Sequence, residues 1–264
     1  MNTTERKMLD ILKELKEEHN IVAIKAEFEA EGSRTDELVM LNEIIFRADL
    51  KLFIKIGGCE AVRDLDQCRL LGASGIMAPM IESPFAMKKF VGAAKKVYEK
   101  DWQNMEWIIN AETVTCHENL TKIFDEGKGF LSTVSIGRVD LSASMGLTRN
   151  EINGDEVFNI TKDIAQKAKE YGFNVNFGGG ISMDAIPFIQ NMYPLNDRFE
   201  TRKVVFHATD DEKVLRGGIV KAMEFETLYL KNKCEYYGRM AEEDKARLKM
   251  MAERLEIAGS DLIV

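Results

Sequence analysis

The chain has 264 residues and a formal net charge of −8, and no basic stripe interleaved with aromatic residues occurs, which argues against a nucleic-acid surface. No apolar run approaches the roughly 18 residues that a membrane span needs. The four cysteines lie far apart without a CxxC pair, so we expect reduced thiols and a cytoplasmic protein. The charged, helical start is unlike a signal peptide, and the length and the scarcity of proline predict one domain over 1–264.

Short apolar runs alternate with amphipathic helical segments from the start of the chain to about residue 208. This alternation predicts a parallel sheet, and its regularity favours an α/β fold of the (β/α)8 TIM-barrel type. One strand is missing from the pattern; either the eighth is irregular or the first helix takes its place. The predicted strands are 21–29, 50–58, 74–80, 106–112, 130–137, 173–179 and 202–208.

The segment 212–264 is predicted to be a mostly helical C-terminal extension. It is too long to cover one strand. A subunit contact in a homo-oligomer and a helix packed on the surface both remain open.

Two acids stand where predicted strands end. Glu112 follows the apolar run WIINA, and Asp140 follows STVSIG after two further residues. An acid beside a buried strand is costly unless a charge or a metal compensates for it. Neighbouring parallel strands end at the same edge of the sheet, so the pair predicts a divalent-metal site. The alternative is that each carboxylate caps the next helix or pairs with a lysine.

Other charged residues are candidates for the same end of the barrel. Lys25, Glu27 and Glu29 alternate along the first strand and should share one face. On the inside of a barrel they would serve the site or form a structural Lys–Glu network. His207, at the end of another predicted strand, is a candidate acid/base group or a structural residue.

Three further residues complete the candidate pocket. Arg138 could hold a carboxylate or phosphate, or be a surface cation. Glu82, after Pro79 and Met80, could orient a ligand or cap a helix. Gly179 lies in the run GGGIS before a helix, where backbone amides could bind an anion.

Three stretches of the chain resemble one family, the HpcH/HpaI aldolases and citrate lyases. They are LLGASGIMAPMIESPFAMKKFVGAA, IINAET and SIGRVDLSASMG, and together they lie within about residues 50 to 150. The resemblance implies a barrel of the pyruvate- and phosphoenolpyruvate-binding type. It also implies that Glu112 and Asp140 hold Mg²⁺ (or Mn²⁺), which chelates a 2-oxo acid and stabilises its enolate.

The family places a cation, usually an arginine, near the same oxygen. Lys55 is the candidate here, with Gly57 and Gly58 allowing backbone to approach the ligand. The alternative for Lys55 is an ion pair with an acid on a neighbouring strand. Where the family's aldolases carry a Glu–His pair this chain has Glu31 followed by Gly32. Where they carry an aspartate it has Leu70. These departures leave the general base unassigned.

The resulting hypothesis is a metal-dependent carbon–carbon lyase of the aldolase kind. Its substrates would be a 2-oxo acid such as pyruvate, or an enol phosphate, and an aldehyde or acyl partner. Two alternatives remain: a citrate-lyase-like acyl-CoA lyase, with an anion-binding groove near GGGIS, and a non-catalytic barrel that binds a metabolite.

Overall fold

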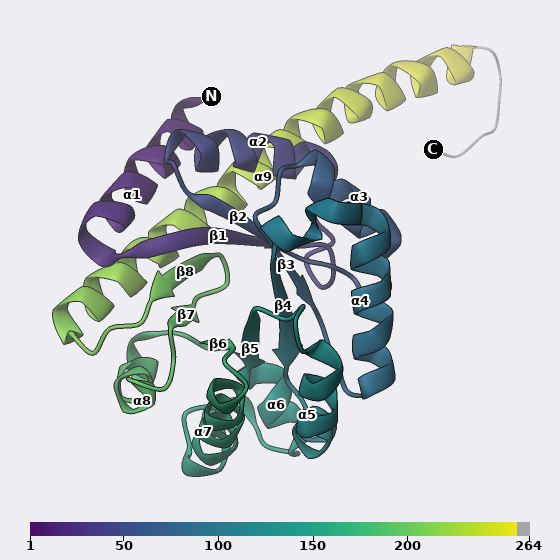
Figure 1. Ribbon diagram of the computed structural model, residues 1–264. Helices are drawn as coiled ribbons and strands as arrows, with labels where there is room; N and C mark the ends of the chain where they lie inside the picture. Colours follow the sequence, from purple (N-terminus) through teal and green to yellow (C-terminus); the bar gives the residue numbers. More distant parts are fainter. Residues whose placement is uncertain (258–264) are drawn as a thin grey trace.

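Eight strands close into a barrel in the computed structural model, which describes residues 1–257 (Figure 1). The predicted barrel is confirmed, and so is the helical C-terminal segment as far as Ile257. Residues 258–264 of the predicted extension lie outside the described part. The strands are β1 (Ile21–Glu27), β2 (Lys51–Lys55), β3 (Gly75–Ala78), β4 (Glu106–Ala111), β5 (Thr133–Gly137), β6 (Asn174–Gly178), β7 (Arg198–Glu200) and β8 (Val204–His207).

Helices surround the barrel because the apolar outer faces of the strands need cover. The helices bury apolar residues on their inner sides, for example Met8, Leu12 and Leu15 in the first. The helices are α1 (Thr3–His19), α2 (Thr35–Arg47), α3 (Val62–Leu70), α4 (Pro84–Tyr98), α5 (Val114–Gly127), α6 (Arg138–Ser144), α7 (Asp155–Glu170), α8 (Ile186–Met192) and α9 (Glu212–Ile257). In this part of the chain no helix is long and apolar enough to cross a membrane.

The last two strands depart from a regular (β/α)8 barrel. β1 to β7 pair in parallel with their sequence neighbours, whereas β8 runs antiparallel to both β7 and β1. Only the turn 201–203 joins β7 to β8. A parallel connection needs a crossover of about a dozen residues or more, so this short link forces a hairpin. The strand missing from the sequence pattern is β7, with only three residues.

The interior of the barrel is layered. A middle layer is apolar and contains Ala23, Phe53, Met77, Ile108 and Val205. Towards the amino ends of the parallel strands lies the ion pair of Arg198 and Glu106 (2.5 Å). Towards their carboxyl ends the layer is polar, and it leads to the loops at the mouth. The interior members of that layer are Lys25, Lys55, Asn110, Ser135, Asn176 and Glu200.

Because β8 runs antiparallel to the other strands, it ends at their amino ends. The helix that follows, α9, therefore begins there and runs back towards the carboxyl ends of the parallel strands. It packs along α1, where Asn2 donates from its side chain to Asn232 (2.8 Å). Residues 238–251 are all exposed, and Figure 1 shows this yellow end projecting away from the barrel. The first half of α9 therefore fits the packed-surface alternative, and a role of the projecting half in a homo-oligomer stays a prediction.

Candidate active site at the barrel mouth

A polar pocket of about 420 Å³ lies at the carboxyl ends of the parallel strands, the end where barrels of this type carry their active sites. It contains both predicted metal ligands and the charged face of the first strand. The charged side chains that line it are Lys25, Glu27, Glu29, Lys55, Glu112, Asp140, Arg149, Glu200, Arg202 and Glu226.

Glu112 lies at the base of this pocket with its side chain only 1% exposed. It follows β4, and its two carboxylate oxygens are held separately. Oε1 accepts a hydrogen bond from the backbone N–H of Met80 (3.0 Å), and Oε2 accepts one from Asn110 Nδ2 (2.7 Å). Burial raises the pKa of Glu112, and the nearby Lys55 and these hydrogen bonds offset that effect only in part. The carboxylate thus lies where further positive charge would stabilise it.

Lys55 lies between two acids at the end of β2. Its Nζ is 2.6 Å from Glu29 Oε2 and 3.5 Å from Glu112 Oε2. Burial alone would lower the pKa of Lys55, but Glu112 and Glu29 outweigh it and raise the pKa above its ordinary value. Lys55 is therefore a fixed ammonium at neutral pH, suited to stabilising an oxyanion and unsuited to accepting a proton.

Asp140 is the third residue of α6 and lies exposed on the pocket wall. It makes no hydrogen bond or ion pair within residues 1–257, so its oxygens are free. Together with the undercompensated Glu112, it offers two carboxylates, a set that suits Mg²⁺ or Mn²⁺ with the remaining positions filled by water and substrate. The described residues contain no cluster of three or more histidine, cysteine or acidic side chains that could enclose a metal. Glu112 and Asp140 therefore fit an open metal site, in which water and substrate would supply the remaining ligands.

Gly137, the last residue of β5, allows Glu112 to occupy its position. A Cβ on Gly137 would lie 2.6 Å from Glu112 Oε2 and 2.9 Å from Glu112 Cβ. The side chain of Glu112 therefore packs directly against this backbone, and glycine is the residue that leaves room for it.

Arg138 does not line the pocket, contrary to its predicted role as a cation for the substrate. It is fully buried behind the wall, and its guanidinium donates to the carbonyls of Gly178 (3.3 Å) and Gly179 (2.6 Å) and to Asn153 Oδ1 (2.8 Å). It also lies over the ring of Phe188 at 4.2 Å. Burial lowers its pKa to about 10, still far above neutrality. The alternative prediction, that Arg138 is a surface cation, is also wrong. Arg138 instead anchors the glycine loop that follows β6.

Gly179 does line the pocket, as its place in GGGIS predicts. Its φ is +86°, and a Cβ there would lie 2.8 Å from the backbone nitrogen of Val139. The loop after β6 therefore packs closely on the first turn of α6, the helix that carries Asp140.

The other predicted ligand-binding residues lie outside the pocket. Gly57 donates its N–H to Asp64 in α3 (2.7 Å), and neither Gly57 nor Gly58 is part of the lining. Glu82 accepts a hydrogen bond from Thr113 Oγ1 (2.6 Å) and is likewise absent from the lining.

His207 lies at the opposite end of the barrel. β8 is antiparallel, so its last residue pairs with Arg198 at the start of β7, and its N–H donates to Asn20, just before β1. Burial, Arg198 and Lys51 all lower the pKa of His207. Its predicted acid/base role assumed a parallel strand, and the structure places it away from both predicted metal ligands, Glu112 and Asp140.

Several lining residues were not singled out from the sequence, among them Asn110, Arg149 and Arg202. Asn110 could have been found, because it lies two residues before Glu112 and strand side chains repeat with period two. Arg149 begins the short 3-10 helix Arg149–Glu151 and Arg202 lies in a turn, and neither belongs to a motif. Nothing in the sequence pattern brings them to the mouth.

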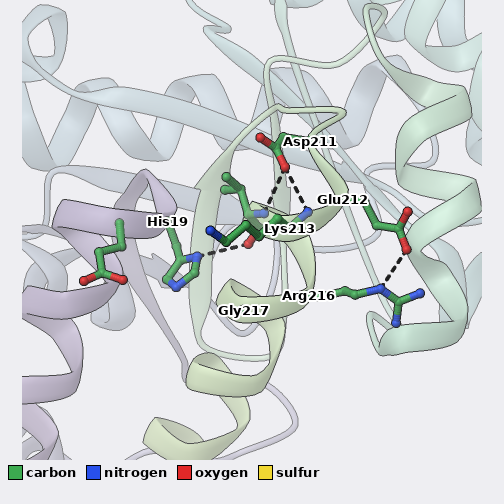
Figure 2. Close-up of a pocket in the computed structure, with 8 residues that line it drawn as sticks. His19, Asp211, Glu212, Lys213, Arg216 and Gly217 are labelled. Atoms are coloured by element: carbon green, nitrogen blue, oxygen red, sulfur yellow. Dashed lines mark hydrogen bonds and ion pairs between the residues drawn. The ribbon is translucent and has the colours of Figure 1, made fainter.

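A second, larger hollow of about 870 Å³ lies at the amino end, between the end of α1 and the start of α9 (Figure 2). Most of its polar side chains are engaged in helix capping and local contacts. Asp211 accepts from the N–H groups of Lys213 and Val214, and Glu212 pairs with Arg216 at 2.7 Å. This hollow therefore has fewer charged side chains than the mouth, and only Glu18 and Lys213 among them are without a hydrogen bond or ion pair in the described residues.

A closed barrel with an acid pair, a lysine and a glycine loop at its carboxyl-end mouth is the architecture of a barrel enzyme. The family model of the HpcH/HpaI aldolase/citrate lyase family matches residues 26–178, which is more than half of the chain. The chain belongs to this family. It is therefore of a lyase or aldolase kind, acting on small molecules.

Solved structures share the fold at low sequence identity. An HpcH/HpaI aldolase from Desulfitobacterium hafniense DCB-2 is 15% identical with a TM-score of 0.60, over 73% of this chain and 82% of that one. An HpcH/HpaI aldolase/citrate lyase family protein from Burkholderia cenocepacia J2315 is 14% identical with a TM-score of 0.60, over 84% and 90%. RipC from Yersinia pestis is 12% identical with a TM-score of 0.52, over 78% and 88%. No curated protein sequence matches significantly.

Proposed function

We propose that this protein is a metal-dependent carbon–carbon lyase that forms or cleaves an aldol bond through the enolate of a 2-oxo acid such as pyruvate. The observation that carries the proposal is the meeting of Glu112, Asp140 and Lys55 at the mouth of the barrel. The family membership supports the lyase kind of activity.

Glu112 and Asp140 would hold Mg²⁺ or Mn²⁺. When bound, such a metal supplies a Lewis acid for the carboxylate and keto oxygens of the 2-oxo acid. Lys55 adds a fixed positive charge beside Glu112, where negative charge develops on the keto oxygen. The pair of Lys55 and Glu29 keeps this ammonium in place.

Glu29 is the group that we assign to proton transfer. It reaches the pocket with a side chain 25% exposed, and its Oε2 lies 2.6 Å from Lys55 Nζ. In the synthetic direction the C3 proton of pyruvate passes to the Glu29 carboxylate, and the electron pair of that C–H bond forms the enolate. C3 then bonds to the carbonyl carbon of the aldehyde, and the aldehyde oxygen takes up the proton that Glu29 received. Cleavage is the reverse.

The decisive measurement is Mg²⁺-dependent exchange of the pyruvate methyl protons with D₂O, followed by NMR on the wild type and on Asp140→Ala. We expect exchange that requires metal and falls at least about a hundredfold in the variant. Mn²⁺ binding, measured by electron paramagnetic resonance on the same two proteins, tests the metal site without relying on activity.

Other outcomes would redirect the assignment. Metal binding without exchange, together with cleavage of an acyl-CoA, would identify a citrate-lyase-like enzyme that uses the same acids. Metal binding with neither activity would leave a metabolite-binding barrel. Wild-type exchange that needs no metal and persists in Asp140→Ala would refute the proposed role of the acid pair.

A further inference from the structure

The turn of the β7–β8 hairpin carries a guanidinium to the mouth of the barrel. The two antiparallel strands are connected by Thr201, Arg202 and Lys203. Because β7 runs parallel to β1–β6, the turn that follows it lies at the carboxyl-end face of the barrel. Arg202 lines the pocket with a side chain 63% exposed. It stands at the rim, above the polar layer that includes Glu200 of β7.

The ion pairs of Arg202 leave it free to change partners. Its Nε lies 2.8 Å from Glu31 Oε1, and its Nη2 lies 3.8 Å from Glu27 Oε1. Glu31 has a second cation, because the buried ammonium of Lys203 holds its other oxygen, Oε2. When Arg202 turns towards a ligand, Glu31 therefore keeps a charged partner. Glu27 keeps the hydrogen bond that its Oε1 accepts from the backbone N–H of Glu31 (3.1 Å).

A second guanidinium lines the same pocket from the short 3-10 helix Arg149–Glu151. Arg149 follows α6, is exposed, and forms no ion pair within the described residues. A guanidinium offers a planar set of N–H donors that matches a carboxylate or a phosphate in a bidentate manner. These two guanidinium groups lie at the rim, with the proposed metal ligands and Lys55 below them. Glu27 and Glu226 also line the pocket, and Glu226 is held on the 201–203 turn by Thr201 Oγ1 and the N–H of Lys203.

We propose that Arg202, assisted by Arg149, determines specificity for the second substrate by binding an anionic group, a carboxylate or a phosphate, at the end remote from its reacting carbonyl. This inference rests on the proposed aldol function. It assigns the electrophile to a charged class, whereas the acid pair alone would accept any aldehyde.

The test compares aldehydes of matched length that differ in their remote group. 5-Oxopentanoate and pentanal differ by a carboxylate against a methyl group, and glyceraldehyde 3-phosphate and glyceraldehyde differ by a phosphate. We measure kcat/KM for aldol addition to pyruvate with each aldehyde and take the anionic-to-neutral ratio within each pair. The wild type should favour at least one anionic aldehyde, and the pair that does so identifies the group.

Variants at the rim test the assignment to these two residues. Arg202→Gln should reduce the ratio roughly ten- to hundredfold, as expected for losing a charge-assisted hydrogen bond, and Arg149→Gln should reduce it less. Arg202→Lys keeps the charge without the planar donor set and should fall between the wild type and Arg202→Gln. Arg216→Gln is the matched control, because Arg216 is 56% exposed and paired with a glutamate at the amino end.

The outcomes separate this inference from the proposed function. Absence of metal-dependent pyruvate exchange in the wild type would refute the proposed function and, with it, this inference. Exchange together with a wild-type ratio near one, or with a ratio that Arg202→Gln leaves unchanged, would refute only the role of the rim. Should Arg202→Gln fail to fold, Arg202→Lys and Arg149→Gln supply the same comparison.

Discussion

Replacing Gly137 with alanine should displace Glu112 from the metal site. The added Cβ would lie 2.6 Å from Glu112 Oε2 and 2.9 Å from Glu112 Cβ. The carboxylate could rotate away at little cost, but Cβ is fixed to the backbone that follows β4. The clash therefore requires a backbone shift. Movement of the carboxylate would also strain its hydrogen bonds from Asn110 and Met80.

Overpacking of this kind costs about 1–3 kcal/mol. For a chain of this size each kcal/mol lowers the melting temperature by roughly 2–4 °C, so we expect a decrease of about 2–12 °C. Because Glu112 is a proposed metal ligand, Mn²⁺ affinity should also fall by about tenfold or more.

Thermal unfolding and Mn²⁺ titration of Gly137→Ala check both expectations. Gly92→Ala is the matched control, because Gly92 lies inside α4 and a Cβ there meets nothing within 4 Å. Alanine at that helical position should stabilise the protein by about 0.5–1 kcal/mol. A Gly137→Ala protein with wild-type stability and wild-type Mn²⁺ affinity would refute the argument that this glycine makes room for Glu112.

Two further predictions concern buried charges. Arg138→Lys should destabilise the protein by about 2–4 kcal/mol in urea unfolding, because a lysine cannot donate to the carbonyls of both Gly178 and Gly179 and to Asn153; a change below about 0.5 kcal/mol would contradict the anchoring role. Burial alone would raise the pKa of Glu31, but Lys203 and Arg202 outweigh it and hold the pKa below its ordinary value. The stabilisation is therefore present above the unfolded-state pKa and is lost as the pH falls through the folded-state pKa. In urea unfolding from about pH 6 to about pH 3, the stability difference between the wild type and Glu31→Gln should narrow with acidification, and a constant difference would show that Glu31 does not contribute in this way.

The sequence was sufficient to predict the barrel because seven of its strands lie in distinct apolar runs with helices between them. β7 was missed because Arg198, Phe199 and Glu200 contain a single apolar residue. The direction of β8 was wrong because alternation along a strand is the same whichever way the strand runs. The short link to β8 held the relevant signal, but it could be interpreted only once β7 was known.

At the site, the family resemblance implied that Lys55 lies near Glu112, and period two along the predicted strand 21–29 placed Glu29 at the same pocket. Arg138 illustrates the limit. It lies two residues from Asp140 on α6, and residues two apart on a helix do not share a face. This spacing argued against a common pocket, but only after 138–144 were recognised as helix. Because the run SIGRVD resembles the end of a strand, the start of α6 at Arg138 could not be recognised from the sequence.

Closure of the barrel has a consequence for how the chain folds. β1 forms one side of the seam, and its partner across it is β8, with Ile24 paired to Val204 near the other end of the sequence. During synthesis the edge of β1 that does not pair with β2 stays unpaired until β8 has been synthesised. In the same way, α1 cannot pack against α9 until α9 has been synthesised. Pairings between such distant segments form slowly, because their loop-closure entropy is lost before any contact compensates for it. We therefore expect the seam between β1 and β8 to be the last part of the sheet to form.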